Sequence, residues 1–191
     1  MVGSIDDFDW RWDILNENIS VDDFVCEKHH EFEDFLKNAA LLYQEERLAI
    51  TYVILVGNKL IAYYSLATDK VVMNDSDKNL WKRLSKKIPF DKRRRGYPAL
   101  KLCQLAVDDN YAHNGFGKQI ITQVMLSASD FKVGCRFITV DALPEAEDFY
   151  KKMGFTRLSD TPNPKNDTIP MYFDLGRIEA QPENQNEETN Q

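Results

Sequence analysis

The sequence predicts a single α/β (α+β) domain in which a mixed central sheet of six to seven strands is flanked by about four helices. Short hydrophobic runs of strand length recur along the chain. Two amphipathic stretches of helical spacing lie between strands of the second half, as crossover helices do. The chain has 191 residues, 43% of them hydrophobic, which suits one domain with a full core.

The first half is expected to contain a strand, a helix and a hairpin. Aromatic and aliphatic residues alternate over 8–15, which predicts a strand, and apolar residues recur at helical spacing over 31–42. Two strands over 50–56 and 59–66 flank the turn pair Gly57-Asn58, so we expect a hairpin there. A polar and basic segment follows, with room for a short helix around Leu80, Trp81 and Leu84.

The second half is expected to alternate strands and helices. A strand over 100–107 leads through a polar loop into a helix whose apolar face runs from Ile120 to Ala128. Pro144 at a helix start and Gly154 just past a helix end delimit another helix. The remaining expected elements are a strand over 137–142, that second helix over 145–153, and strands over 155–158 and 169–175.

The sequence lacks the marks of several kinds of protein. No apolar run is long enough to span a bilayer, and the first residues lack the basic and apolar regions of a secretory signal. The three cysteines are too widely spaced to indicate a disulfide framework. The three histidines match no metal-site or catalytic-triad pattern. We therefore expect a cytoplasmic protein with reduced thiols, no metal and no membrane association.

The net charge of −7 is unevenly distributed along the chain. Residues 1–40 carry eleven acids and three bases, whereas residues 82–95 carry eight bases and one acid. Residues 179–191 have four acids, no bases and almost nothing to bury, so we expect one domain over 1–178 and a disordered tail over 179–191. The basic segment is a solvated surface loop or an anion-binding surface, and charge alone does not decide between them.

A strand that runs into a glycine-containing loop carries the first functional signal. The strand ends with Leu105, Ala106 and Val107, and the loop Gly115-Phe116-Gly117-Lys118 opens the next helix. Glycine lets a backbone approach a ligand closely, and the first turn of a helix has unpaired N–H groups at a positive dipole end. Such a turn can hold a pyrophosphate, although the same pattern also occurs as a simple tight turn.

The run from Ala146 to Phe155, with its Phe149-Tyr150 pair and Gly154, follows the next strand and carries the second signal. Together the two blocks resemble the acetyl-CoA-binding half of the GNAT superfamily of N-acetyltransferases, over about residues 50–175. The sequence departs from the family pattern at Ala112, where the family has Arg or Gln. One side-chain anchor for the phosphates is therefore missing, while the backbone N–H donors remain.

The resemblance implies acetyl-CoA as the donor and assigns roles to particular residues. Tyr150 would be the general acid that protonates the leaving thiolate; alternatively, it packs the helix against the sheet. A backbone N–H near Ala106 or Val107 would stabilise the tetrahedral oxyanion. Phe149 is a cofactor-binding candidate that could also belong to the core. The further residues implied to bind the cofactor are Leu105, His113, Asn114, Gly115, Phe116, Gly117 and Lys118.

A narrower resemblance is to the GNAT toxins of bacterial toxin–antitoxin modules, carried by the segments 61–68, 97–108 and 142–143 beside the Phe-Tyr pair. It implies acetylation of the α-amine of aminoacyl-tRNA, a ribbon-helix-helix antitoxin as partner, and a homodimer. The basic residues Lys92, Arg93, Arg94 and Arg95 would then contact tRNA phosphates. The alternatives are acetylation of a small amine or a protein N-terminus, and a non-catalytic acyl-CoA-binding module.

Overall fold

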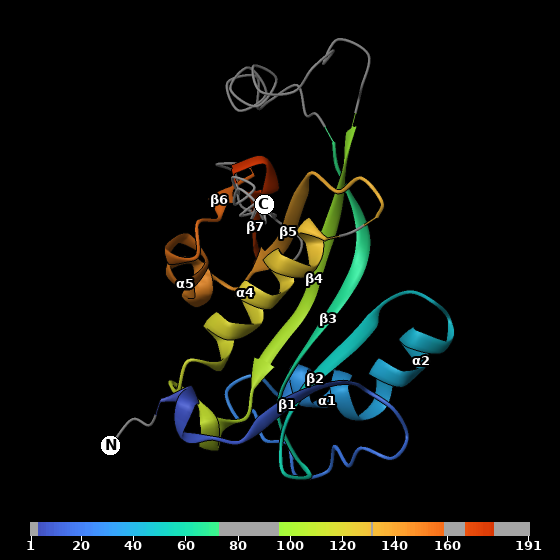
Figure 1. Ribbon diagram of the computed structural model, residues 1–191, viewed down its shortest axis with the longest axis vertical. Coiled ribbons are helices and arrows are strands. Elements are labelled where there is room, and N and C mark those ends of the chain that lie inside the picture. The colour runs from blue at the N-terminus through green and yellow to red at the C-terminus, as the bar shows by residue number, and fades with distance from the viewer. Residues whose placement is uncertain (1–3, 73–95, 131, 159–166, 178–191) are drawn as a thin grey trace, which may run out of the picture.

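The computed structural model describes residues 4–72, 96–130, 132–158 and 167–177, and a seven-stranded mixed sheet forms its centre (Figure 1). The strands occur in the spatial order β1-β2-β3-β4-β5-β7-β6. Only β4 and β5 are parallel neighbours; the other pairs are antiparallel. The strands are β1 (Trp10–Ile14), β2 (Ile50–Val56), β3 (Lys59–Val72), β4 (Gly96–Val107), β5 (Phe137–Ala142), β6 (Thr156–Arg157) and β7 (Ile169–Asp174).

Helices cover both faces of the sheet (Figure 1). α4 and α5 pack on one face, where Ile120, Val124 and Tyr150 belong to the same buried cluster as Leu102 and Val140 of the sheet. α1 and α2 pack on the other face, over a second buried cluster. The helices are α1 (His30–Asp34), α2 (Ala40–Glu45), α4 (Phe116–Ser129) and α5 (Glu147–Lys152), with a wide π turn over Phe35–Ala39 between the first two. Short 3-10 turns lie at η1 (Ile5–Asp7), η5 (Asp109–Tyr111), η6 (Pro144–Ala146) and η7 (Leu175–Arg177).

The predicted fold class is confirmed, and the main differences concern the ends of elements. β3 and β4 continue past the predicted ends because Asp69 and Lys70 pair with Ala99 and Pro98 and can point polar side chains away from the core. The helix predicted over 145–153 starts as a 3-10 turn, and Gly154 follows it at a φ of +88° as a left-handed cap. The short helix predicted around Leu80 and the tail over 179–191 lie outside the described residues.

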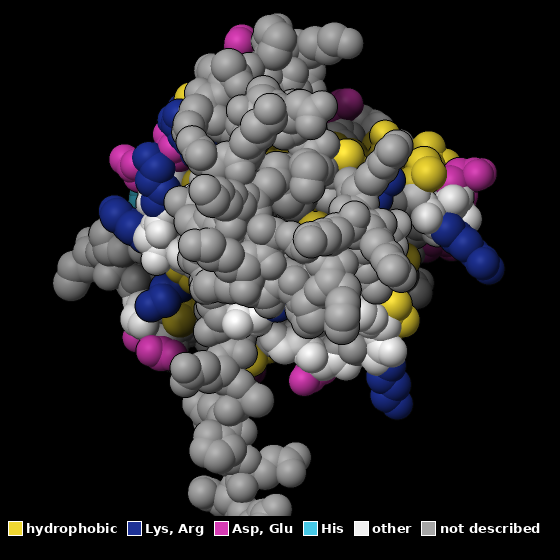
Figure 2. Space-filling view, turned by 90° about the horizontal axis from the view of Figure 1, so that it is seen from above, with side chains coloured by type: hydrophobic (Ala, Val, Ile, Leu, Met, Phe, Trp, Pro, Cys, Tyr) yellow, Lys and Arg dark blue, Asp and Glu magenta, His cyan; other side chains and the backbone are white. Residues whose placement is uncertain are grey.

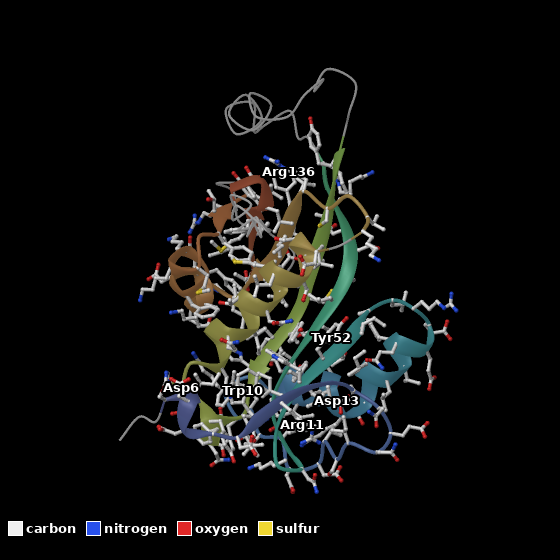
Figure 3. All side chains as sticks on the ribbon, in the orientation of Figure 1. Asp6, Trp10, Arg11, Asp13, Tyr52 and Arg136 are labelled. Carbon is white, nitrogen blue, oxygen red and sulfur yellow. The ribbon has the colours of Figure 1, made fainter. Side chains whose placement is uncertain are left out.

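At the end of the edge strand β1, where Asp13 lies (Figure 3), side chains form hydrogen bonds with the backbone. The backbone N–H of Ile14 donates to the Asp13 carboxylate at 2.8 Å, and the Asn16 amide donates to the Ile14 carbonyl at 3.0 Å. On the face that looks towards α4, the Trp10 and Trp12 rings meet edge to face at 5.6 Å. Backbone groups that are satisfied locally cannot pair with another strand, so this end of β1 is protected against sheet extension.

Candidate functional site

A slot opens in the sheet where β4 parts from β5. The parallel pairing of these strands ends with Leu102 opposite Val140. The next residue, Cys103, is the extra residue of a bulge in the β3–β4 ladder, because Gln104 already pairs with Ser65. A bulge bends its strand, and beyond this one β4 stays paired with β3 alone. One backbone edge of β4 therefore faces the slot without a partner strand in the described part of the chain.

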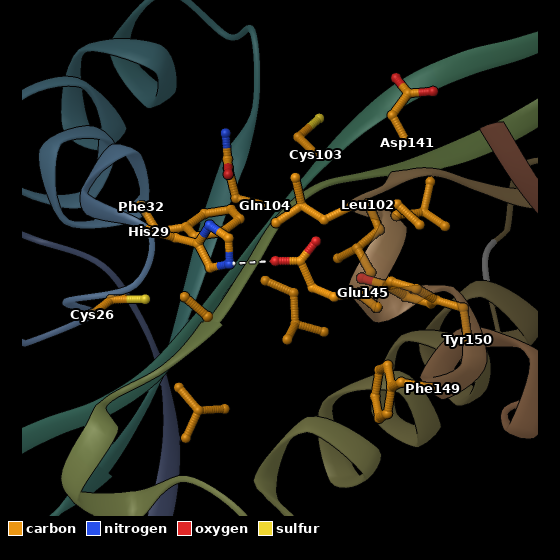
Figure 4. A pocket seen from close by; sticks show the side chains of 17 residues that line it. Cys26, His29, Phe32, Leu102, Cys103, Gln104, Asp141, Glu145, Phe149 and Tyr150 are labelled. Carbon is orange, nitrogen blue, oxygen red and sulfur yellow. Dashed lines mark ion pairs between the residues drawn. The ribbon is translucent and has the colours of Figure 1, made fainter. Parts of the chain in front are cut away.

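A pocket of about 240 Å³ occupies this slot (Figure 4). Its walls come from four places: the segment around α1, the end of β4, the end of β5, and the start of α5 with its preceding turn. The lining residues are Cys26, His29, Phe32, Leu102, Cys103, Gln104, Leu105, Ala106, Val107, Val140, Asp141, Ala142, Leu143, Glu145, Ala146, Phe149 and Tyr150. The pocket thus contains five of the residues that the sequence predicts for the site: Leu105, Ala106, Val107, Phe149 and Tyr150.

Tyr150 points from α5 into this pocket (Figure 4). Its ring packs against Phe149 and Phe155 at centroid distances of 5.2 and 5.4 Å, and the residue is 6% exposed. Burial raises the pKa of the Tyr150 phenol far above its ordinary value, so the hydroxyl keeps its proton at neutral pH. The ring therefore packs α5 in place while the residue brings a protonated hydroxyl to the slot.

The predicted phosphate loop lies outside the pocket lining, at the start of α4. His113 and Gly115 have positive φ values of 65° and 96°, and Gly115 is the N-cap residue of α4 without a capping side chain. Among the described residues, the backbone N–H groups from His113 to Lys118 donate no hydrogen bond, although Gln119 N–H donates to Gly115. Free N–H groups at a helix start can bind an anion such as a diphosphate.

Gly117 lies beside a pocket residue. A Cβ atom at this position would lie 3.5 Å from the Phe149 ring, which lines the pocket. That distance is an ordinary van der Waals contact, so packing against Phe149 does not require glycine here. Phe149 is thereby both a pocket residue and a contact between α5 and the loop, which accommodates both interpretations that the sequence left open.

Twelve of the 17 lining residues were not predicted as site residues, and among them are Cys26, His29, Phe32 and Glu145. The segment that carries the first three is tied to the end of β4, since Asp108 accepts from Val25 N–H at 3.1 Å and Asp109 accepts from Glu27 N–H at 2.8 Å. These contacts join parts of the chain that are far apart in sequence. No local pattern around an isolated histidine or glutamate indicates such a contact.

The lining holds two carboxylates and one histidine, and none of the described lysines or arginines lines the pocket. Glu145 contacts His29 Nε2 at 3.0 Å and Lys28 Nζ at 3.1 Å through the same oxygen (Figure 4). Its pKa is lowered, first by its own backbone N–H and then by Lys28. Asp141 is paired with Lys101 at 2.7 Å.

The residues Lys92, Arg93, Arg94 and Arg95 lie outside the described part of the chain. Among the side chains drawn in colour in Figure 2, basic and acidic groups lie beside one another around the rim of this face. No helix of the described residues is long and apolar enough to cross a membrane. In the same residues, no group of three or more His, Cys, Asp or Glu side chains is placed to hold a metal ion.

Comparisons with known proteins agree with this geometry. Residues 77–172, half of the chain, match the acetyltransferase (GNAT) domain family. The chain therefore belongs to the GNAT acetyltransferases, and the resemblance read from the sequence is confirmed. No curated protein matches the chain.

Solved structures of GNAT toxins share this fold. AtaT complexed with acetyl-methionyl-tRNAfMet is 21% identical, with a TM-score of 0.73 over 90% of this chain and 98% of AtaT. A tyrosine-to-phenylalanine mutant of KacT is 22% identical, with a TM-score of 0.72 over 89% and 97% of the two chains. AtaTR bound with acetyl-CoA is 19% identical, with a TM-score of 0.69 over 90% and 96%. At these identities the likeness shows the fold alone.

Proposed function

We propose that this protein is an acetyl-CoA-dependent N-acetyltransferase whose acceptor is the α-amine of an aminoacyl-tRNA. The observation that carries the proposal is the slot between β4 and β5, which has an unpaired strand edge on one side and Tyr150 on the other. The family and the AtaT complexes with acetyl-CoA and acetyl-methionyl-tRNAfMet support the donor and the acceptor, respectively.

The described residues fit such a donor in three places. The free N–H groups at the start of α4 suit a diphosphate. The open edge of β4 can pair with the amides of an extended pantetheine arm in the way that strands pair. Apolar side chains such as Leu105, Val107 and Phe149 line the slot and keep water from the reacting carbonyl.

Acetyl-CoA supplies the activated acetyl group, and the protein supplies placement and proton transfer. An N–H of the β4 edge near Ala106 or Val107 donates to the carbonyl oxygen as negative charge develops there. The acceptor nitrogen forms the new C–N bond while the C–S bond breaks. Tyr150 donates its phenolic proton to the departing sulfur, which suits a hydroxyl that stays protonated at neutral pH. The proton that the nitrogen loses on becoming an amide restores the phenol.

The test is incubation with labelled acetyl-CoA and a pool of charged tRNA, followed by identification of the labelled product. We expect N-acetyl-aminoacyl-tRNA, formed by the wild type and not by Tyr150→Phe. Label on small amines or on protein N-termini, with none on tRNA, would identify the second class of acceptor instead. Binding of coenzyme A without any transfer would identify a non-catalytic module. That alternative is motivated by Ala112, which stands where the family has Arg or Gln.

The proposed tRNA contact by Lys92, Arg93, Arg94 and Arg95 has a separate test. Phosphate contacts make affinity fall with salt, and each lost contact reduces the salt dependence. Replacing Arg93, Arg94 and Arg95 by glutamate should weaken tRNA binding and flatten its salt dependence. Unchanged binding and slope would show that the segment is a solvated loop. A partner antitoxin, which AtaT has in AtaR, would be tested by co-purification from a host that expresses the neighbouring gene.

A further inference from the structure

An ion-pair contact crosses the pocket from the α1 side to the α5 side (Figure 4). His29 lies just before α1, and Glu145 lies in the turn before α5. His29 Nε2 and Glu145 Oε1 are 3.0 Å apart, and both residues line the slot. The His29 side chain is 23% exposed, so the ring is largely enclosed while its Nε2 edge reaches the pocket.

Within the described ranges, four charged or titratable side chains surround His29 or its partner Glu145. Glu31 on α1 lies 3.3 Å from Nδ1, and Glu145 lies 3.0 Å from Nε2. Lys28 reaches the same oxygen of Glu145 at 3.1 Å but does not line the pocket. The Cys26 thiol lines the pocket beside the ring, and burial raises its pKa, so it stays neutral. His29 therefore has a carboxylate at each ring nitrogen.

The charges of the lining favour a cation. Asp141 and Glu145 are the acidic lining residues among those that the structure describes, and within the same ranges no lysine or arginine lines the pocket. Glu145 is held ionised by its own backbone N–H and by Lys28, which lower its pKa. Asp141 is already occupied by Lys101 at 2.7 Å. Lys28 and His29 both contact Oε1 of Glu145, so the two ion-pair contacts leave Oε2 for a ligand.

We propose that Glu145 and His29 form the acceptor-amine subsite of the acetyl transfer, in which Glu145 holds the acceptor ammonium and His29 Nε2 takes its proton. This inference rests on the proposed function and adds the base that the sequence did not reveal. Glu31 can accept a hydrogen bond from Nδ1. When neutral His29 carries its proton on Nδ1, its Nε2 atom can take a proton from a substrate that lies between it and Glu145.

Each proton of the transfer has a place to go. An ammonium, a neutral imidazole and a carboxylate become a neutral amine, an imidazolium and a carboxylate. The amine nitrogen then forms the C–N bond as the C–S bond breaks, and Tyr150 protonates the sulfur. The proton that the nitrogen loses on becoming an amide restores the Tyr150 phenol, and His29 releases its proton to solvent. The distance between His29 Nε2 and Glu145 in the structure, 3.0 Å, would let the carboxylate accept a hydrogen bond from the imidazolium that this step produces. The carboxylate that holds the substrate thus also stabilises the protonated base.

The rate of acetylation as a function of pH tests the role of His29. Without a base, only the neutral amine reacts, and an α-amine with a pKa of about 8 is about one-tenth neutral at pH 7. The rate of His29→Gln should therefore fall roughly tenfold at pH 7 and recover about fivefold between pH 7 and pH 8, where about half of the amine is neutral. The wild-type rate should depend less steeply on pH over the same range. The assay uses labelled acetyl-CoA and a charged tRNA pool in short incubations between pH 6 and 9.

Glu145→Gln tests the carboxylate. It should raise the KM for charged tRNA more than it lowers kcat, because it removes the charge that holds the ammonium. The matched control is Lys28→Gln, which removes the other cation on Glu145 outside the pocket and should leave the pH profile unchanged. Coenzyme A binding, measured by calorimetry, should be the same in all three variants, which also shows that each is folded.

The outcomes separate this inference from the proposed function. If the wild type acetylates tRNA and the pH–rate profile of His29→Gln has the same shape as that of the wild type, the subsite assignment is wrong and the proposed function stands. A profile that changes equally in Lys28→Gln would also overturn it, because the effect would then be general electrostatics at Glu145. If the wild type binds coenzyme A but transfers acetyl to no acceptor, the proposed function fails and the subsite fails with it.

Discussion

Tyr150 is the residue on which the proposed chemistry depends most directly. A phenylalanine at this position would keep the ring contacts with Phe149 and Phe155 but would lack the hydroxyl that donates the proton. Tyr150→Phe should therefore lower kcat by roughly 10²- to 10⁴-fold, as the loss of a general acid does, and leave coenzyme A binding intact. Initial rates with charged tRNA measure this. Tyr52→Phe, which removes a hydroxyl from a tyrosine outside the pocket, should be fully active.

Gly115 is the residue that shapes the proposed phosphate loop. Its φ of +96° is one that residues with a Cβ rarely adopt. Gly115→Ala should cost on the order of 1–2 kcal/mol of stability and weaken coenzyme A binding, because the N–H groups of the loop would turn away. Urea unfolding and calorimetry measure the two effects. Gly134→Ala, where φ is not positive and a Cβ would meet nothing within 4 Å, should change neither; equal effects at both positions would contradict this role.

At the scale of elements, the bulge in β4 creates the site. A strand that remained paired with β5 beyond Leu102 would leave no slot, so the extra residue Cys103 is what parts the two strands. The slot then needs α5 held firmly against it, because α5 carries Tyr150 and Phe149. α5 is joined to β6 by Glu147, which accepts from Arg157 Nε and Nη2 at 2.5 and 2.8 Å.

This connection between α5 and β6 should make stability depend on pH. Hydrogen bonds from Arg157 and then Lys151 lower the pKa of Glu147 from its ordinary 4.5 to about 2. Because the pKa of Glu147 is lower in the folded state than in the unfolded state, the ionised carboxylate stabilises the fold at any pH above the unfolded-state pKa. This stabilisation is lost as the pH falls from about 4.5 towards 2. The wild type should thus have a larger free energy of unfolding than Glu147→Gln at pH 7, and this difference should be smaller at pH 3.

Urea unfolding at pH 7, 4 and 3 measures that difference. Glu46→Gln is the matched control, since Glu46 is an exposed glutamate directly after α2, and its effect should be small at every pH. A difference for Glu147→Gln that stays constant from pH 7 to pH 3 would show that the contact with Arg157 does not hold α5 in place.

For the whole molecule, the sequence predicted the order of elements because the strongest patterns are local. Alternation in 50–56 and the apolar face from Ile120 to Ala128 depend on neighbours a few residues away. Glycine and proline positions such as Gly154 and Pro144 also act locally, at helix ends. The family resemblance added the relation between the two motif blocks, which local patterns do not contain.

The parts that the sequence could not predict are contacts between distant segments. The extension of β3 and β4 arises because each strand offers the other a pairing edge. The meeting of His29 with Glu145 depends on Asp108 and Asp109 tying the segment before α1 to the end of β4. Such contacts follow from the assembled sheet, and no periodicity or spacing in the chain indicates them.

The central claim is that the slot between β4 and β5 holds acetyl-CoA, and calorimetric titration of the full chain with coenzyme A tests it most directly. The account predicts saturable heat for one site per chain, unchanged in His29→Gln, because His29 lies on the acceptor side. Bound ligand at a hundredfold excess over Kd should also stabilise the fold by about 2.7 kcal/mol. No heat and no thermal shift at millimolar coenzyme A would contradict the assignment of the slot.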